Sequence, residues 1–245
     1  MLCEDRVALV TGASGGICRS VALTLAREGA SVIVNYRSNE KEAQAVLDCI
    51  QKEGGKAIAV QADIQTEKGC QDLVDAGEKE YGRIDICIIS PGGGFTPAPF
   101  DKLDAEEAIL DVTKEVAPAF RLMRLVLPGM YKHKWGRIIG MGQHPTKTYQ
   151  PAFAHNAAKD ARSALLKLAA EGETWSKGIT VNNISPSPVE VCKTIKEAIE
   201  QCTHGKAWTD RKTTTGQDIA EAIAFLCSEA GRFITGCVLP FDHRD

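Results

Sequence analysis

The segment FAHNAAKD, residues 153–160, places His155 and Lys159 four positions apart on a predicted helix. Residues four apart lie on one face of a helix, so the imidazole and the amine are expected to face the same side. An imidazole exchanges protons near neutral pH because its unperturbed pKa is about 6.5. A neighbouring ammonium favours the neutral ring and so weakens it as an acid. His155 and Lys159 are therefore candidate chemical residues on one helix face.

A second candidate site is the glycine-rich stretch VTGASGGICRS, which follows the first predicted strand and opens the first predicted helix. Glycines let the backbone approach a pyrophosphate closely, and a helix N-terminus supplies unpaired N–H groups and the positive end of the helix dipole. The stretch therefore predicts a dinucleotide-binding turn.

Short β-branched runs alternate with amphipathic stretches along the chain. Most of the runs are apolar throughout, as parallel strands covered on both faces are. The predicted strands are residues 6–10, 31–35, 56–60, 85–89, 136–140, 179–184 and 237–240. The predicted helices are residues 20–29, 42–54, 68–82, 104–130, 152–172 and 218–231, with caps at Gly29, Gly54, Gly82 and Gly231. Repeated β-α units predict an α/β fold: one domain over residues 1–245, with a doubly wound, Rossmann-type parallel sheet of about seven strands and helices on both faces.

The polar segment 188–215 lies between the sixth predicted strand and the last predicted helix, and it carries Trp208. It forms either a lid over the cleft at the carboxyl ends of the strands or a solvated surface helix with a loop. The sequence leaves both interpretations open.

Composition and charge exclude several classes of function. The net charge of −3, without a basic run, argues against nucleic acid or an anionic membrane as a partner. The stretch MLCEDRVALVTG has acids early and indicates a strand rather than a signal peptide, and no apolar run is long enough to cross a bilayer. The nine cysteines contain no C-x-x-C pair and no metal-ligand spacing, so we expect no metal and a reducing compartment, the cytoplasm.

The T-G-x-x-x-G-x-G spacing of the glycine turn is that of the short-chain dehydrogenase/reductase family, which the chain resembles over essentially its whole length. Other motifs carry the resemblance in the expected order: QADIQ, LPGM, GRII, NNISPSPVE and FITGCVLPFD. The resemblance implies an NAD or NADP cofactor and hydride transfer between nicotinamide and an alcohol or carbonyl.

The resemblance also assigns residues to the cofactor site. Those expected at the phosphates, the adenine and the loop after the fourth strand are Gly12, Ser14, Gly16, Ile17, Asp63, Ile64 and Gly92. Arg37 follows the second strand, where NAD-dependent members carry an acid. It either meets the 2′-phosphate of NADP or is a solvated loop residue.

Three positions of the cofactor site depart from the family pattern. Cys18 replaces the last glycine of the turn, Pro91 stands in the loop that normally reads Asn-Asn-Ala-Gly, and Ser187 replaces a glycine near the nicotinamide. Cysteine adds bulk where the backbone packs tightly, and proline fixes φ beside the cofactor. Together these changes predict that no dinucleotide is bound tightly, with weaker binding of NAD or NADP as the alternative.

Four chemical positions follow from the resemblance: a general-acid tyrosine, a lysine that lowers its pKa and holds the ribose, a serine that binds the substrate oxygen, and an asparagine that anchors a relay water. In this chain they fall at His155, Lys159, Gln143 and Glu115, so only the lysine is kept. A carboxylate within reach of Lys159 is expected to pair with it, because an unpaired buried charge is costly. We therefore predict an ion pair between Glu115 and Lys159.

Three functions fit these patterns. The first is a chain inactive by itself that pairs with an active paralogue of the family, expected as a heterotetramer, similar to an inactive subunit of a heteromeric dehydrogenase acting on an alcohol or hydroxyacyl-CoA. The second is an active NAD(P)H-dependent carbonyl reductase that uses His155 and Lys159. In that case Tyr149 or His144 is either a substitute acid or an exposed loop residue. The third is a ligand-binding regulator that uses the old cofactor cleft.

Overall fold

The computed structural model describes residues 1–92, 95–143, 151–204 and 213–241, with only the backbone at 202–204. Seven parallel strands form one sheet in the order β3-β2-β1-β4-β5-β6-β9. The strands are β1 (Val7–Val10), β2 (Ser31–Tyr36), β3 (Ala57–Gln61), β4 (Ile86–Ile89), β5 (Gly136–Met141), β6 (Ile179–Pro186) and β9 (Val238–Phe241). The strand order reverses between β1 and β4, which is the point where doubly wound sheets bind their ligands.

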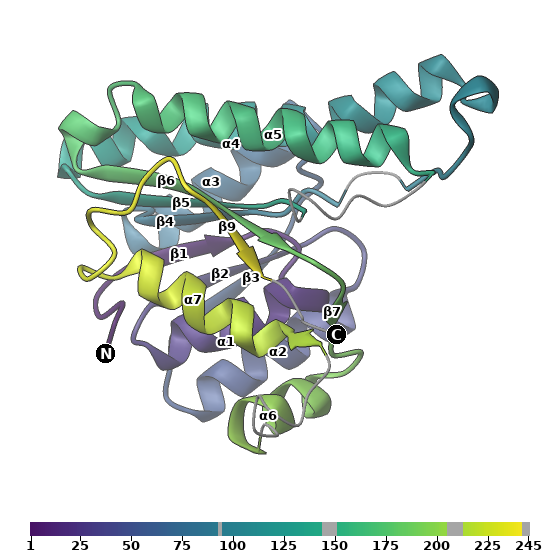
Figure 1. The fold of residues 1–245 in the computed structure, drawn as a ribbon. Coiled ribbons are helices and arrows are strands. Elements are labelled where there is room, and N and C mark those ends of the chain that lie inside the picture. Colours follow the sequence, from purple (N-terminus) through teal and green to yellow (C-terminus); the bar gives the residue numbers. More distant parts are fainter. Residues whose placement is uncertain (93–94, 144–150, 205–212, 242–245) are drawn as a thin grey trace.

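Helices cover both faces of the sheet (Figure 1). One layer is α1 (Gly16–Arg27), α2 (Glu40–Lys52) and α7 (Gly216–Cys227). The other layer is α3 (Glu67–Tyr81), α4 (Ala105–His133) and α5 (Phe153–Glu171). The predicted doubly wound fold is therefore confirmed.

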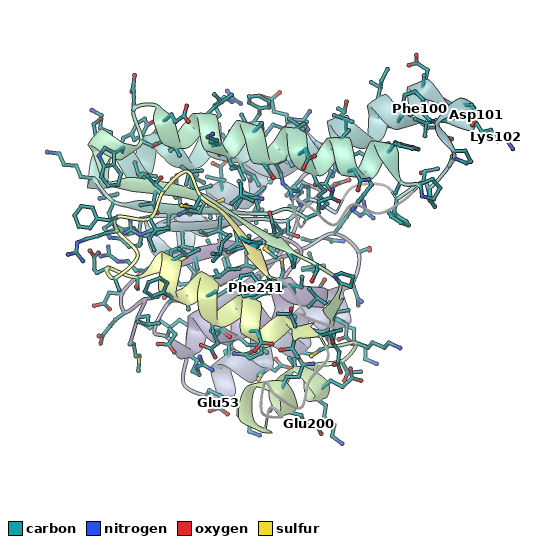
Figure 2. All side chains as sticks on the ribbon, in the orientation of Figure 1. Glu53, Phe100, Asp101, Lys102, Glu200 and Phe241 are labelled. Carbon is teal, nitrogen blue, oxygen red and sulfur yellow. The ribbon has the colours of Figure 1, made fainter. Side chains whose placement is uncertain are left out.

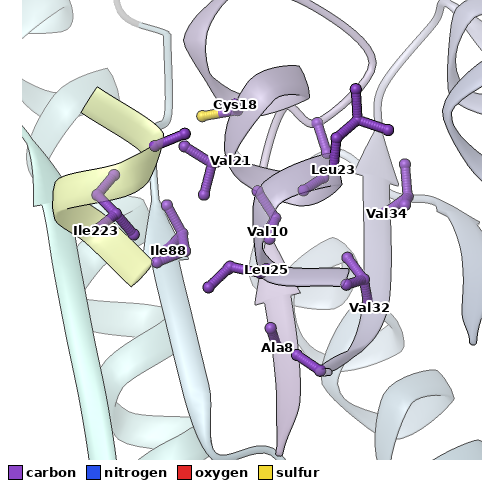
Figure 3. Close-up of a cluster of buried hydrophobic side chains, with 14 of the residues drawn as sticks. Ala8, Val10, Cys18, Val21, Leu23, Leu25, Val32, Val34, Ile88 and Ile223 are labelled. Atoms are coloured by element: carbon purple, nitrogen blue, oxygen red, sulfur yellow. The ribbon is translucent and has the colours of Figure 1, made fainter. Parts of the chain in front are cut away.

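The core consists of two apolar layers, one on each side of the sheet. On β1, Ala8 and Val10 pack into the layer beneath α1 and α7, whereas Val7 and Leu9 pack into the layer beneath α3 and α4. Figure 3 shows the first of these layers, where Val10 lies among side chains of α1, β2 and α7. Because successive side chains of a strand point to opposite faces, both faces need apolar residues, which explains the uninterrupted apolar runs.

Helix ends agree with the predicted glycine caps except at the last helix. Gly29, Gly54 and Gly82 have positive φ at the ends of their helices. The prediction for Gly231 is wrong, because α7 ends at Cys227 and the extended residue Ser228 is its C-cap. Gly231 instead allows close backbone packing, since a Cβ there would lie 2.7 Å from the carbonyl oxygen of Leu226.

The polar segment after β6 contains a helix, α6 (Ile195–His204), flanked by two short strands that pair with each other, β7 (Val189–Glu190) and β8 (Thr214–Thr215). The sequence patterns did not predict these two strands. Trp208 lies outside the described residues. None of the described helices is long and apolar enough to cross a membrane.

The N-terminal end of α4 and the short helix η1 (Phe100–Lys102) before it extend beyond the edge of the sheet (Figure 1). Phe100, Asp101 and Lys102 lie at the tip of this extension (Figure 2).

Candidate active site

A cavity of about 490 Å³ opens at the carboxyl ends of the strands. Its walls come from residues that directly follow β1, β2, β3, β4 and β5, together with the end of β6. All the cofactor residues expected from the sequence line it, namely Gly12, Ser14, Gly16, Ile17, Arg37, Asp63, Ile64 and Gly92. The volume lies within the range of small-molecule and cofactor sites, which is roughly 300–1,000 Å³.

The N-terminus of α1 fits a phosphate group. Gly15 is the N-cap and makes no side-chain capping bond, and the first turn holds no acidic residue. A Cβ built on Gly15 or Gly16 meets no atom within 4 Å, so these glycines border open space. Gly12 and Gly16 have φ of 64° and 56°, a conformation that favours glycine. The unpaired N–H groups of this turn are therefore accessible to an anion from the cavity.

Two polar side chains that the sequence patterns did not single out hold this glycine turn in place. The Asn35 side-chain oxygen accepts a hydrogen bond from the Gly12 N–H at 3.3 Å, and its amide donates to the Ala62 carbonyl at 3.1 Å. The buried Arg19 donates from Nη2 to the Ser14 carbonyl at 2.7 Å and to the Glu42 carboxylate at 2.5 Å. No spacing rule marks either residue, because their partners lie on other elements.

The three residues that depart from the family pattern, Cys18, Pro91 and Ser187, leave the cavity open. Cys18 forms part of its wall, and its buried thiol packs into the core layer beneath α1. Burial raises the pKa of the Cys18 thiol, while a hydrogen bond with Ser90 acts in the opposite direction. Pro91 also lines the cavity, and the backbone N–H of the buried Ser187 donates to the Phe241 carbonyl at 2.8 Å.

Glu115 and Lys159 form the predicted ion pair. Lys159 Nζ lies 2.8 Å from Glu115 Oε1, with the lysine side chain 15% exposed and the glutamate 1% exposed. Glu115 projects from α4 and Lys159 from α5, so the contact crosses the packed interface of these two helices. At this site Lys159 has a fixed carboxylate partner on the neighbouring helix.

Arg162 is a third charged member of this cluster, and the sequence patterns did not identify it. Its Nη1 donates to the second oxygen of Glu115, and its side chain is fully buried. Its Nε and Nη2 have no hydrogen-bond partner among the described residues. Desolvation lowers the pKa of the Arg162 guanidinium, and the Glu115 charge opposes that effect. One carboxylate thus binds two cationic side chains, the partly exposed Lys159 and the buried Arg162.

His155 lies in the first turn of α5, and its ring packs against the ring of Phe95 at 5.2 Å in an edge-to-face arrangement. The described lining of the cavity includes Lys159 but not His155, Gln143 or Glu115. The structure therefore brings one of the four expected chemical positions to the cavity. His144 and Tyr149 lie outside the described residues.

Gln143 follows β5 and is 5% exposed. Neither its Nε2 nor its Oε1 has a hydrogen-bond partner in the described part of the chain. A buried polar group without a partner costs about 1–3 kcal/mol. Its two preceding residues, Met141 and Gly142, do line the cavity.

Gln65 connects the cavity to α4. Pro118 lies inside α4 and has no N–H, so it cannot make the usual bond to the carbonyl of residue 114. The Gln65 side-chain amide donates to that Lys114 carbonyl at 3.1 Å, and the Gln65 backbone carbonyl accepts from Arg121 Nη1 at 2.8 Å. Gln65 also lines the cavity, so α4 and the cavity share this side chain.

A second, almost wholly apolar hollow of about 320 Å³ lies beside the projecting end of α4. Its lining comes from η1 and the first turns of α4 and α5, and includes Phe100, Ile109 and Phe153. Phe100 and Phe153 pack edge to face at 5.2 Å. No group of three or more metal-ligating side chains was found among the described residues.

A doubly wound sheet with a glycine turn and a cavity at its strand ends defines a dinucleotide-binding type of α/β protein. Residues 12–243 match the family model described as Enoyl-(Acyl carrier protein) reductase. The 1,6-dihydroxycyclohexa-2,4-diene-1-carboxylate dehydrogenase of Acinetobacter baylyi is 34% identical over 258 residues, covering 99% of this chain and 97% of that protein. The chain belongs to the short-chain dehydrogenase/reductase family of oxidoreductases.

Solved structures agree with this assignment. A 7α-hydroxysteroid dehydrogenase in complex with NADH and 7-oxo glycochenodeoxycholic acid has a TM-score of 0.84 at 30% identity, covering 98% of this chain and 94% of that one. A short-chain dehydrogenase of Burkholderia cenocepacia J2315 in complex with NADP has a TM-score of 0.83 at 25% identity, covering 99% and 98%. These relatives bind NADH and NADP.

Proposed function

We propose that this chain is a catalytically degenerate short-chain dehydrogenase/reductase that serves as the non-catalytic subunit of a hetero-oligomeric NAD(P)-dependent alcohol dehydrogenase. The observation that carries the proposal is the Glu115 carboxylate held between Lys159 and Arg162. In active members the lysine acts beside a tyrosine, whereas here it is bound to a carboxylate. The residue at the tyrosine position, His155, packs its ring against Phe95.

The same cluster accounts for the loss of proton transfer. A positioned acid or base is worth roughly 10²–10⁴-fold in rate, and residues that act as a unit are not additive, so losing the tyrosine removes most of the effect. A fixed ion pair replaces the relay water that an asparagine would anchor. The rewired-reductase alternative requires His155 to reach a substrate in the cavity, yet His155 is absent from the described lining.

The cavity keeps the residues that would hold a dinucleotide cofactor. The N–H groups of the α1 N-terminus would hold the pyrophosphate, Arg37 the 2′-phosphate of NADP, and Lys159 the ribose. A bound dinucleotide supplies hydride exchange with a carbon centre in active members of the family. In this chain the cleft residues bind and orient, and we expect weak rather than tight binding because of Cys18, Pro91 and Ser187.

An active paralogue of the same fold is the proposed partner, most simply in a heterotetramer. Large apolar side chains are exposed on the outer surfaces of the helices that related chains use for assembly, for example Phe120 on α4 and Leu168 on α5. The pattern of replaced residues resembles the inactive subunit of the heteromeric hydroxybenzylsuccinyl-CoA dehydrogenase. A hydroxyacyl-CoA is therefore the first substrate class to test on the assembled enzyme.

Co-expression with the active short-chain dehydrogenase encoded nearest to this chain tests the proposal. We expect the two chains to co-elute in a fixed ratio, with alcohol oxidation by the complex and none by this chain alone. In the complex, His155→Ala leaves turnover unchanged, whereas Tyr→Phe at the partner's active-site tyrosine abolishes it.

Two results would contradict the subunit role. Turnover by the isolated chain that His155→Ala abolishes would support the carbonyl reductase. Tight ligand binding without turnover and without any complex would support a regulator that uses the cavity.

A further inference from the structure

We propose that Lys159 is a reactive amine at the wall of the cavity, and that it takes small aldehydes and ketones as imines. This reactivity goes beyond the subunit role and does not depend on it, because it needs no partner chain.

The Lys159 side chain is accessible from the cavity. Lys159 is the one lysine among the described residues that line the cavity. Its side chain is 15% exposed, whereas those of Glu115 and Arg162 are 1% and 0% exposed. Of the three charged members of the cluster, only the lysine can meet a molecule in the cavity, which is large enough for a small carbonyl compound.

The charges of Lys159, Arg162 and Glu115 do not balance. Two cations, the partly exposed Lys159 and the buried Arg162, share the carboxylate of Glu115, so positive charge is in excess among these three described residues. Arginine does not lose its proton in proteins, so the cluster reaches neutrality most easily when Lys159 gives up its proton. The Glu115–Arg162 pair then remains intact, and the neutral amine still donates a hydrogen bond to Glu115.

Neighbouring groups both lower and raise the pKa of Lys159. Desolvation is the largest effect and lowers the pKa of Lys159, and the Arg162 charge on α5 lowers it further. Glu115 on α4 and, more weakly, Cys18 on α1 oppose this by raising it. Burial raises the pKa of the Cys18 thiol, so the thiol stays protonated near neutral pH and adds little negative charge. The net direction is a lowered pKa, which increases the uncharged share of the amine at any given pH.

The chemistry follows from the uncharged form of the amine, which borders an open cavity. The Lys159 nitrogen lone pair attacks the carbonyl carbon, a C–N bond forms, and the oxygen takes up a proton to give a carbinolamine. Loss of the hydroxyl group as water and of the remaining amine proton leaves the imine. The step consumes one carbonyl compound, releases one water and needs no oxidant or reductant.

Labelling with pyridoxal, trapped by borohydride and mapped by peptide mass spectrometry, tests the proposal on the full chain. At pH 7.5 we expect Lys159 to be labelled faster than the exposed Lys68 and Lys196, because its lowered pKa leaves a larger share of the amine uncharged. The labelling rate of Lys159 should reach its plateau at a lower pH than the labelling rates of Lys68 and Lys196. Labelling of Lys159 no faster than that of Lys68, or a rate that still rises above pH 10, would overturn the proposal.

Arg162→Met provides the matched variant. Without the neighbouring guanidinium, Lys159 keeps Glu115 as its counter-charge and holds its proton more tightly, so labelling at pH 7.5 should fall roughly tenfold and recover at higher pH. Arg124→Met, which changes an exposed arginine on α4, should label like the wild type. An unchanged rate in Arg162→Met would also overturn the proposal. If that variant does not fold, the wild-type pH profile decides the question by itself.

Discussion

Glu115 on α4 and Arg162 on α5 form an ion pair in which both side chains are buried. Lys159 binds the other oxygen of the same carboxylate, so two residues from α5 hold one residue of α4. Glu115 thus makes a structural contact between two helices. The contact joins two residues that lie 47 positions apart in the sequence.

Glu115→Gln should destabilise the fold strongly. The substitution leaves Arg162 buried without a counter-charge, and breaking a buried pair in this way costs about 3–5 kcal/mol. Urea unfolding measures the loss. Asp72→Asn, which breaks the exposed Lys68–Asp72 pair, is the control and should change stability by less than about 1 kcal/mol. A loss below about 1 kcal/mol in Glu115→Gln would show that the cluster does not support the fold.

Gln65→Ala should cost about 1 kcal/mol, because the Lys114 carbonyl loses its hydrogen bond. The cost should vanish in a Pro118→Ala background, where the alanine restores a backbone N–H that can bond to that carbonyl within the helix. A double-mutant cycle in urea measures this coupling. In a Pro128→Ala background, which alters a different turn of α4, the cost should be the same as in the wild type. Equal costs in all three backgrounds would disprove the capping role.

Arg37→Ala should weaken NADPH binding by roughly tenfold and leave NADH binding unchanged. A hydrogen bond to a charged group is worth about 1.5–3 kcal/mol, and only NADPH carries the 2′-phosphate. Fluorescence titration with both nucleotides measures the ratio, with Arg124→Ala as a control away from the cavity. Equal effects on the two nucleotides would favour the solvated-loop interpretation of Arg37.

Thiol labelling at pH 8 should be fastest at Cys237, which is exposed. Burial raises the pKa of Cys3 to about 12 and that of Cys87 to about 12, so almost no thiolate forms there, whereas Cys237 is exposed. In a Cys202→Ser background we expect one fast-reacting thiol with a disulfide reagent. Replacing Cys237 with serine as well should remove the fast phase. A fast phase of more than one thiol would show that the partly exposed Cys49, whose thiol pKa is raised by burial, or one of the buried cysteines is accessible to the reagent.

Sequence reasoning was most accurate where partners lie close in the chain or follow a family pattern. The strand runs and the glycine turn were predicted because each depends on local periodicity or on one strand-turn-helix unit. The Glu115–Lys159 pair was predicted because the resemblance places both residues at one site and an unpaired buried charge is costly.

Other features had no local signal. Arg162 stands three residues after Lys159 on a helix, where an arginine usually reaches solvent. Gln65 caps the carbonyl left open by a proline that lies 53 positions further along the chain, and nothing in the spacing links them. The helix α7 ends at Cys227 with Ser228 as its C-cap, and Gly231 packs against the backbone of Leu226 instead of capping the helix.

The amino-acid sequence by itself determined the layered α/β architecture and the family, because periodicity and motif order can be read directly from the chain. Only the tertiary structure decided that Lys159 and Arg162 both bind the Glu115 carboxylate. It also decided that Lys159 rather than His155 borders the cavity, and that the cavity stays open around Cys18. The physical reason is that burial, and the pairing of charges it enforces, depends on which helices pack together across the sheet.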